Sequence, residues 1–160
     1  MSRPQPLEVL QRDAMHQVPG TRSERRQEAL RTLASAREFR KSAELALEQR
    51  LKLPAISSLH EASRLAISAQ AASNGFRFSN RGAAHVAVVD YALALKLVDR
   101  TEWAQLDELR DLRHKANYPS DLIEPTNVEI DQFKSLADTV IGRSQNKIAP
   151  IPPPPKPEIT

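Results

Sequence analysis

The sequence predicts an all-α fold, an up-and-down bundle of about five helices, on three observations. Apolar residues recur at intervals of three and four along most of the chain, which is the spacing of one helix face. Aromatic residues make up only 4% of the chain, whereas strands favour β-branched and aromatic side chains. Alanine and leucine dominate the apolar residues, which suits closely packed helices. No alternating pattern typical of a strand stands out.

The first two long helices are expected at about residues 22–49 and 55–73. Pro54 separates them, because proline disfavours helical geometry at the residue before it. One face of the first helix is apolar and consists of Leu30, Leu33, Ala36, Phe39, Ala43, Ala46 and Leu47. One side of the second helix carries mostly small residues, namely Leu59, Ala62, Ala66, Ala69 and Ser73. Gly75 is the expected stop of the second helix.

Three further helices are expected at about residues 81–98, 101–117 and 127–143. Pro119 ends the middle one at or before Tyr118. The last begins at a capping box in which Thr126 is followed three residues later by Glu129. The apolar faces of the three consist, in chain order, of Ala84, Ala87, Val88, Tyr91, Leu95 and Val98; of Leu106, Leu109, Leu112 and Ala116; and of Ile130, Phe133, Leu136, Ala137, Val140 and Ile141.

The two ends of the chain are expected to differ from the bundle, which we place at residues 23–145. Residues 1–22 form an N-terminal extension with several prolines and a possible short helix at 7–17. Residues 146–160 hold half of the twelve prolines and predict a flexible, extended tail, because proline fixes φ and removes a donor. An alternative for the tail is a docking ligand for an aromatic-lined groove.

Composition excludes several classes of site. The chain has no cysteine and only four glycines, which excludes disulfides and thiolate metal sites and makes a glycine-rich phosphate loop unexpected. The histidines are dispersed, so we expect no metal and no cofactor. No run of 18 apolar residues and no apolar leader occur, so we expect no membrane partner and a cytoplasmic protein. The net charge of +3 allows a nucleic-acid partner without requiring one.

The densest polar run is LRDLRHKANYPSD, residues 109–121. Arg110, His114 and Asn117 share a helix face by their spacing, and Arg113 lies four residues before Asn117. Guanidinium groups of Arg110 and Arg113 match phosphate geometry, a histidine can move a proton near neutral pH, and Tyr118 could stack on a base. The alternative, which pattern alone favours, is a solvated helix end whose basic residues complement the helix dipole.

Other basic and histidine residues receive a structural interpretation. The basic residues of the first long helix alternate with glutamates and predict a salt-bridged exposed face rather than a nucleic-acid stripe. They are Arg22, Arg25, Arg26, Arg31, Arg37, Arg40 and Lys41. His60 is expected to be a partly buried structural residue. His16 and His85 each follow an arginine by four residues, a common coincidence to which we attach no chemistry.

Residues 34–143 resemble the HEPN superfamily (higher eukaryote and prokaryote nucleotide-binding domains). The likeness is carried by AREFRKSAELALEQRLKLPAISSLHEASRLAISAQAASNGFRFSNRGAAH followed by LRDLRHKANY. HEPN domains are bundles of four or five helices in which an Ala-rich second helix ends at a glycine-containing connector. Their fourth helix ends in a short Arg-containing polar motif. The segment from Arg113 to Tyr118 is similar to the Arg-x-x-Ala-Asp-Tyr variant of that motif, with Asn117 in place of aspartate.

The resemblance implies RNA or nucleotide binding through Arg113 and its neighbours. Many HEPN members are metal-independent ribonuclease toxins, paired with a nucleotidyltransferase antitoxin, and they commonly act as homodimers. Their ribonuclease motif is an arginine followed by a histidine after four to six residues. This chain departs from it, since only three residues separate Arg110 from His114.

We therefore expect a HEPN-like domain of a toxin–antitoxin or other defence-related system, with a degenerate ribonuclease motif. The expected phosphate-binding residues are Arg110, Arg113, Asn117 and Tyr118. A first alternative is an active ribonuclease in which Arg113 stabilises the phosphate and His114 or Tyr118 transfers the proton. A second alternative is a non-catalytic helical adaptor that binds only protein.

Overall fold

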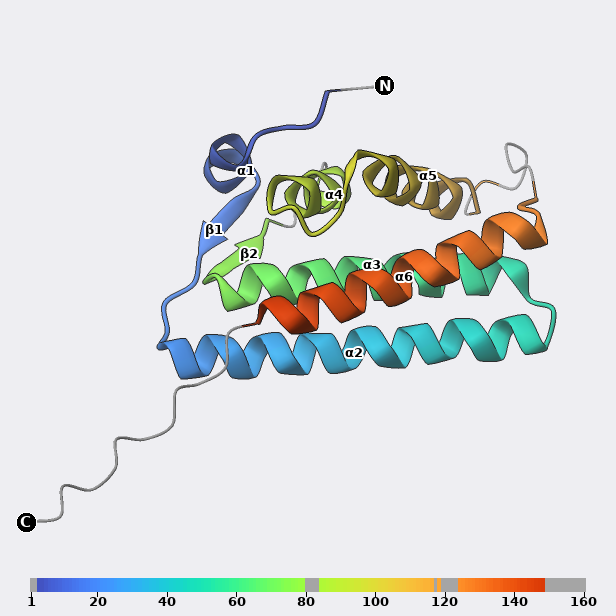
Figure 1. Ribbon diagram of the computed structural model, residues 1–160, viewed down its shortest axis with the longest axis horizontal. Coiled ribbons are helices and arrows are strands. Elements are labelled where there is room, and N and C mark those ends of the chain that lie inside the picture. The colour runs from blue at the N-terminus through green and yellow to red at the C-terminus, as the bar shows by residue number, and fades with distance from the viewer. Residues whose placement is uncertain (1–2, 80–83, 117, 119–123, 149–160) are drawn as a thin grey trace, which may run out of the picture.

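The computed structural model describes residues 3–79, 84–116, 118 and 124–148. Within them the chain forms six helices and one pair of short strands, which confirms the predicted all-α bundle. The long helix α2 (Arg22–Glu48) lies along one edge, α3 (Lys52–Ser73) and α6 (Asn127–Lys147) form the middle, and α4 (Ala84–Ala94) and α5 (Arg100–Ala116) lie across the opposite side (Figure 1). None of these helices is long and apolar enough to cross a membrane.

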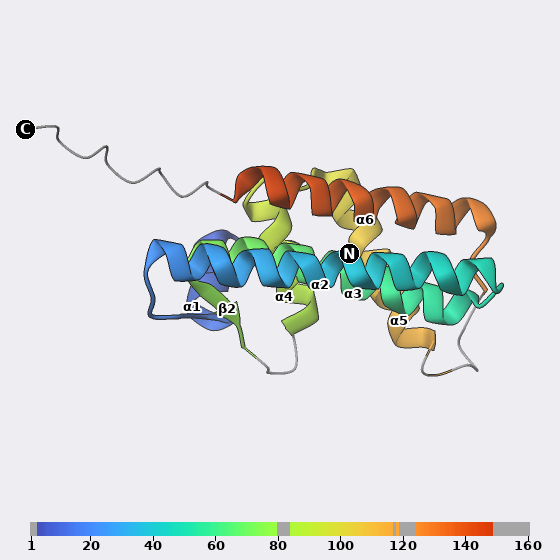
Figure 2. The same ribbon diagram turned by 90° about the horizontal axis from the view of Figure 1, so that it is seen from below.

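The antiparallel helices α2 and α3 form the most extensive helix–helix contact of the described bundle. Seen from below, α2 lies in front of α3 (Figure 2). A capping box begins α2, because Thr21 Oγ1 accepts from the backbone of Glu24 at 3.1 Å and Glu24 Oε2 accepts from the backbone of Thr21 at 3.1 Å. Helix α3 begins at Lys52, three residues before the predicted start. Pro54 lies in its first turn, where the missing N–H removes no helical bond.

Helices α4 to α6 differ from prediction at their ends. Helix α4 ends at Ala94, four residues early, because Lys96 adopts a left-handed φ of 57° and the N–H of Leu97 returns to the carbonyl of Ala92 at 2.9 Å. Helix α6 begins at the predicted cap, where Thr126 Oγ1 accepts from the backbone of Glu129 at 3.2 Å. It continues to Lys147, four residues beyond the predicted end.

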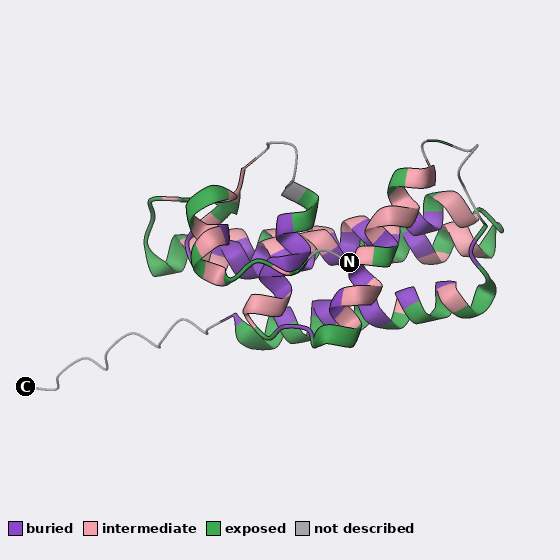
Figure 3. Cartoon of the chain, turned by 90° about the horizontal axis from the view of Figure 1, so that it is seen from above, coloured by how far each residue is buried: buried purple, intermediate pink, exposed green. Residues whose placement is uncertain are grey.

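The core fills the space between the helices, where the inner faces are buried along the whole bundle (Figure 3). The predicted core face of α2 is correct at Leu33, Ala36 and Ala43, which are fully buried, but wrong at Phe39, which is 40% exposed. Among the described elements, the main packing partners of α2 are α3 and α6. The buried stripe of α2 is therefore narrow, and Phe39 lies at the margin of that stripe.

The N-terminal extension packs onto the bundle. It forms α1 (Leu7–Asp13) and a strand, β1 (Met15–Gln17), that pairs antiparallel with β2 (Phe76–Phe78). Leu10 is completely buried, and Phe78 places its ring edge-on to Tyr91 of α4 at a centroid distance of 5.4 Å. The sequence does not predict these strands, because three residues are too few to show an alternating pattern. They close one end of the cleft described next.

Candidate functional site

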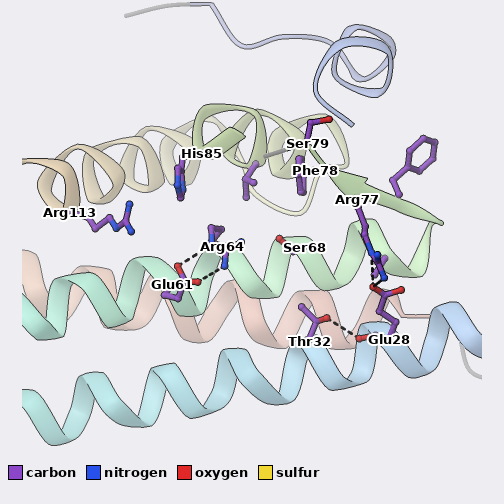
Figure 4. A pocket seen from close by; sticks show the side chains of 13 residues that line it. Glu28, Thr32, Glu61, Arg64, Ser68, Arg77, Phe78, Ser79, His85 and Arg113 are labelled. Carbon is purple, nitrogen blue, oxygen red and sulfur yellow. Dashed lines mark hydrogen bonds and ion pairs between the residues drawn. The ribbon is translucent and has the colours of Figure 1, made fainter. Parts of the chain in front are cut away.

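A cavity of about 630 Å³ opens between α2, α3, β2 and the facing parts of α4 and α5 (Figure 4). Five segments distant in sequence meet around it. Its lining consists of Glu28 and Thr32 of α2; Glu61, Arg64, Ser68 and Ala72 of α3; Phe76, Arg77, Phe78 and Ser79 in and after β2; His85 and Val88 of α4; and Arg113 of α5. The cavity is the place where the motif arginine Arg113 meets the rest of the bundle.

The cations of this cleft differ in their partners. Arg64 forms an ion pair with Glu61 one turn earlier on α3, with Nε 3.0 Å from Oε2. Arg77 forms an ion pair with Glu28 of α2 at 2.6 Å. The side chain of Arg113 forms neither an ion pair nor a hydrogen bond with any residue that the structure describes. The charge of Arg64 and the charge of Arg77 are therefore each offset by a carboxylate. The half-buried guanidinium of Arg113 has no such partner among the described residues.

Two histidines lie beside Arg113. The rings of His60 on α3 and His85 on α4 have their centroids 5.4 Å apart. His60 was predicted to be partly buried and is more buried than that, with 5% of its surface exposed. Its Nδ1 atom has no hydrogen-bond partner among the described residues. Burial lowers the pKa of His60 to about 3, and the positive charge of Arg113 adds to this effect.

His85 is exposed on one side, and its ring lies in the cleft wall (Figure 4). Partial desolvation and the charge of Arg113 lower its pKa below the ordinary 6.5. The same two causes therefore favour the neutral form of both imidazoles. A neutral imidazole accepts a proton or a hydrogen bond, so His85 and Arg113 together offer a proton acceptor and a fixed cation to the same ligand.

The other residues singled out in the sequence do not line this cleft. His114 and Tyr118 pack on each other, with ring centroids 5.2 Å apart, and both are exposed. Arg110 donates from Nε to Asp107 at 3.0 Å, although it is close enough to contribute to the lowered pKa of His85. Asn117 lies outside the described residues. Of the residues predicted for the site, Arg113 lines this cleft, and Arg110, His114 and Tyr118 are not among its lining residues.

Sequence reasoning missed His85, Arg64 and Glu61 as candidate site residues. His85 follows Arg81 by four residues, but Arg12 and His16 have the same spacing, so this step alone carries no specific signal. Arg64 lies four residues after His60, so that both occupy one side of α3, and this spacing was the available signal. The signal becomes specific only when α4 and α5 are seen to place His85 and Arg113 over that side of α3 (Figure 4).

The basic face predicted for α2 is only partly a salt-bridged surface. Arg40 pairs with Glu44 at 3.1 Å and with Asp138 of α6 at 2.8 Å, in agreement with the prediction. Arg25 and Arg31 instead line a second cavity. Glu28 pairs with Arg77 of β2 and not with a neighbour on its own helix.

The chemistry available in the cleft is anion binding and proton transfer. No group of three His, Cys, Asp or Glu residues within the described ranges is arranged to hold a metal ion. Comparison with known proteins adds no assignment, because no family model, no curated protein and no solved structure matches the chain.

Proposed function

We propose that this chain is a HEPN-like domain that binds RNA or nucleotide phosphate in the cleft at Arg113. The observation that carries the proposal is that the guanidinium of Arg113 has no carboxylate partner among the described residues, whereas the other arginines of the cavity, Arg64 and Arg77, each have one. A phosphate oxygen would supply the missing partner, since the guanidinium fork matches phosphate geometry. Partial burial strengthens such a pair by limiting screening by salt.

The sequence resemblance and the helical architecture support the proposal together. The motif arginine of the HEPN-like pattern, Arg113, is the residue that α5 directs into the cleft. The same resemblance extends the proposal to a homodimer and to a nucleotidyltransferase-type antitoxin as partner, in a toxin–antitoxin or defence-related system. Light scattering of the purified chain tests the homodimer, and co-purification with a co-expressed antitoxin candidate tests the partner.

The binding proposal is tested by titrating the protein with a fluorescently labelled RNA dinucleotide. Arg113→Gln should weaken binding about tenfold or more, because one charge-assisted contact is worth about 1.5–3 kcal/mol. Arg12→Gln is the matched control, since Arg12 is an exposed arginine of α1 paired with Asp13 and does not line the cleft. Equal affinity of wild type and Arg113→Gln would refute the proposal.

A second candidate function is metal-independent ribonuclease activity with His85 as the proton acceptor. The observation in its favour is that His85 and Arg113 line one cavity, whereas His114 and Tyr118 do not. His85 would take the proton of a ribose 2′-hydroxyl as the 2′-oxygen attacks phosphorus. The bond to the 5′-oxygen breaks, and the leaving oxygen takes a proton from water while Arg113 stabilises the charged phosphate.

Nuclease activity is tested by inducing expression and separating total RNA on a gel. The ribonuclease proposal expects RNA fragments with wild type and His114→Ala, and intact RNA with His85→Ala and Arg113→Ala. If RNA stays intact with the folded wild-type protein at a concentration where the dinucleotide binds, the ribonuclease proposal is wrong and only the binding proposal remains.

A further inference from the structure

A second cavity lies next to the cleft that Arg113 lines, at the end away from Arg113. It has a volume of about 420 Å³ and lies between the N-terminal segment at Val18–Gly20, the first turns of α2 and the turn after α3. Five residues line both cavities, namely Glu28, Thr32, Ala72, Phe76 and Arg77. Because the two cavities share these five residues, they are adjacent, and we call them together the groove. The Arg77–Glu28 pair, drawn in Figure 4, lines both of them.

The groove carries an excess of positive charge, supplied by arginine. Five arginines and three glutamates line its two cavities within the described chain. Each glutamate is engaged: Glu61 pairs with Arg64 and Glu28 with Arg77, while Glu24 caps α2. Arg25, Arg31 and Arg113 form no ion pair among the described residues.

The unpaired arginines are spaced along the groove and not gathered at one point. On α3 the lining runs from Glu61 to Ala72, which is about 16 Å at the rise of an α-helix. Arg113 lies over the Glu61 end, where its charge affects His60 and Glu61. Arg25 lies at the other end, where its guanidinium packs against the backbone of Gly75. A single phosphate cannot contact both ends.

Phe76 adds an apolar surface in the middle of the groove. It is half-buried and lines both cavities. A groove that tracks a phosphate backbone with cations and offers an aromatic face to a base has the features of single-strand recognition, because unpaired bases can stack on a ring. A duplex keeps its bases paired and turned inward, so Phe76 could not reach them.

We propose that the groove from Arg113 to Arg31 binds a single-stranded polynucleotide, with its phosphates along the arginines and a base against Phe76. This inference rests on the proposed function, because Arg113 is its first phosphate contact. It adds a second phosphate subsite at Arg25 and Arg31, formed with the docked N-terminal segment. The ligand is then a strand of several nucleotides, not a mononucleotide.

The test compares wild type, Arg31→Gln, Arg113→Gln and Arg37→Gln against three labelled probes: an RNA dinucleotide, a single-stranded RNA octanucleotide and the corresponding duplex. Arg37 is the matched control, since it is an exposed arginine of α2 that contacts Gln145 of α6 and lines neither cavity. Unfolding midpoints of all variants establish that each is folded. A DNA octanucleotide of the same sequence shows whether the 2′-hydroxyl contributes.

We expect Arg31→Gln to weaken octanucleotide binding about fivefold to tenfold and to leave dinucleotide binding unchanged, because the dinucleotide does not span both ends. The slope of log K against log salt for the octanucleotide should fall by about 0.7, the value for one phosphate contact in a single strand. Arg113→Gln should weaken both probes, and Arg37→Gln neither.

Two results separate the inference from the proposed function. If Arg113→Gln weakens binding but Arg31→Gln and Arg37→Gln behave as wild type with the octanucleotide, the second subsite is wrong and the function at Arg113 stands. If the duplex binds as tightly as the single strand, the single-strand assignment is wrong. If wild type binds neither the RNA dinucleotide nor the single-stranded RNA octanucleotide, both the inference and the proposed function fail.

Discussion

Arg113 acts on its two histidine neighbours through its charge. Its guanidinium is the second cause, after desolvation, of the lowered pKa of both His60 and His85. Removing that charge while keeping a polar side chain should therefore favour protonation of the rings. The same charge is what makes the cleft suitable for an anion, so a measurement on the histidines reports on the binding site itself.

We predict that Arg113→Gln raises the pKa of His85 toward the ordinary value of 6.5. NMR titration of the imidazole Hε1 signal measures it directly. Lys115→Gln is the control, because Lys115 is on the same helix end, pairs with Asp111 at 3.0 Å and does not line the cleft. An unchanged His85 pKa in Arg113→Gln, or an equal shift in Lys115→Gln, would show that Arg113 is not beside His85.

The buried His60 makes a second prediction, on stability. The unfolded chain protonates this ring below about pH 6.5, whereas the folded chain does so only near pH 3. Between these values the unfolded state binds more protons, so the free energy of unfolding falls as pH is lowered, by up to about 1.4 kcal/mol per pH unit. Above pH 6.5 this contribution to stability is fully present.

Urea unfolding at about pH 7 and about pH 5 measures this dependence. His60→Gln should remove most of the loss at the lower pH, because glutamine does not titrate. His16→Gln should retain it, since His16 is exposed on β1. If His60→Gln and His16→Gln lose stability equally on acidification, the ring of His60 is not the group responsible.

At the scale of the elements, the turn from α3 to β2 depends on Gly75. Its φ is +82°, a conformation that strains residues with a Cβ, and a Cβ there would lie 2.8 Å from Cζ of Arg25. We predict that Gly75→Ala lowers the free energy of unfolding by about 1–3 kcal/mol. It should also displace Arg25 from the second cavity.

Gly142 provides the matched control for that substitution. It lies within α6, and nothing would come within 4 Å of an added Cβ. Gly142→Ala should therefore raise the free energy of unfolding by about 0.5–1 kcal/mol, because alanine loses less conformational freedom in a helix. Chemical denaturation of both variants compares them, and destabilisation by Gly142→Ala or neutrality of Gly75→Ala would contradict the geometry.

The elements that could be predicted are those with strong local signals. The start of α6 follows from the predicted cap at Thr126, which accepts from the backbone of Glu129, although the reciprocal bond of a full capping box is not among the bonds of the described residues. The bounds of α2, predicted from its helical spacing, are accurate to within one residue. The early start of α3 was missed because Pro54 is compatible with a first turn. The end of α4 depends on the left-handed φ of Lys96, which cannot be predicted from the residue type.

The strands show the opposite limit. β1 and β2 are three residues each and are held by pairing across a sequence separation that no local pattern reports, with Met15 opposite Phe78. Val18 donates its backbone N–H to Gly75 at 2.9 Å and Ser79 donates to Ala14 at 2.8 Å, which fastens both sides of the pair. The end of the groove is built from these strands, so it could not be predicted from the sequence.

At the scale of the whole molecule, the sequence predicts one residue of the candidate site, Arg113, but not the residues that surround it. Arg113 was identified from a short motif at a helix end. Its neighbours His60, Arg64 and His85 come from α3 and α4, and only the packing of α4 and α5 over α3 brings them together. The predicted alternative, a solvated helix end, describes His114 and Tyr118 well, since both are exposed.

The most direct test of the central claim is the pKa of His85 measured by NMR with and without a saturating mononucleotide. A phosphate bound at Arg113 places negative charge beside His85 and offsets the guanidinium, so protonation of the ring becomes easier. The account predicts a higher pKa of His85 in the presence of the nucleotide, and no such change in Arg113→Gln. A nucleotide that binds while the pKa of His85 stays the same would contradict it, because the phosphate would then lie outside this cleft.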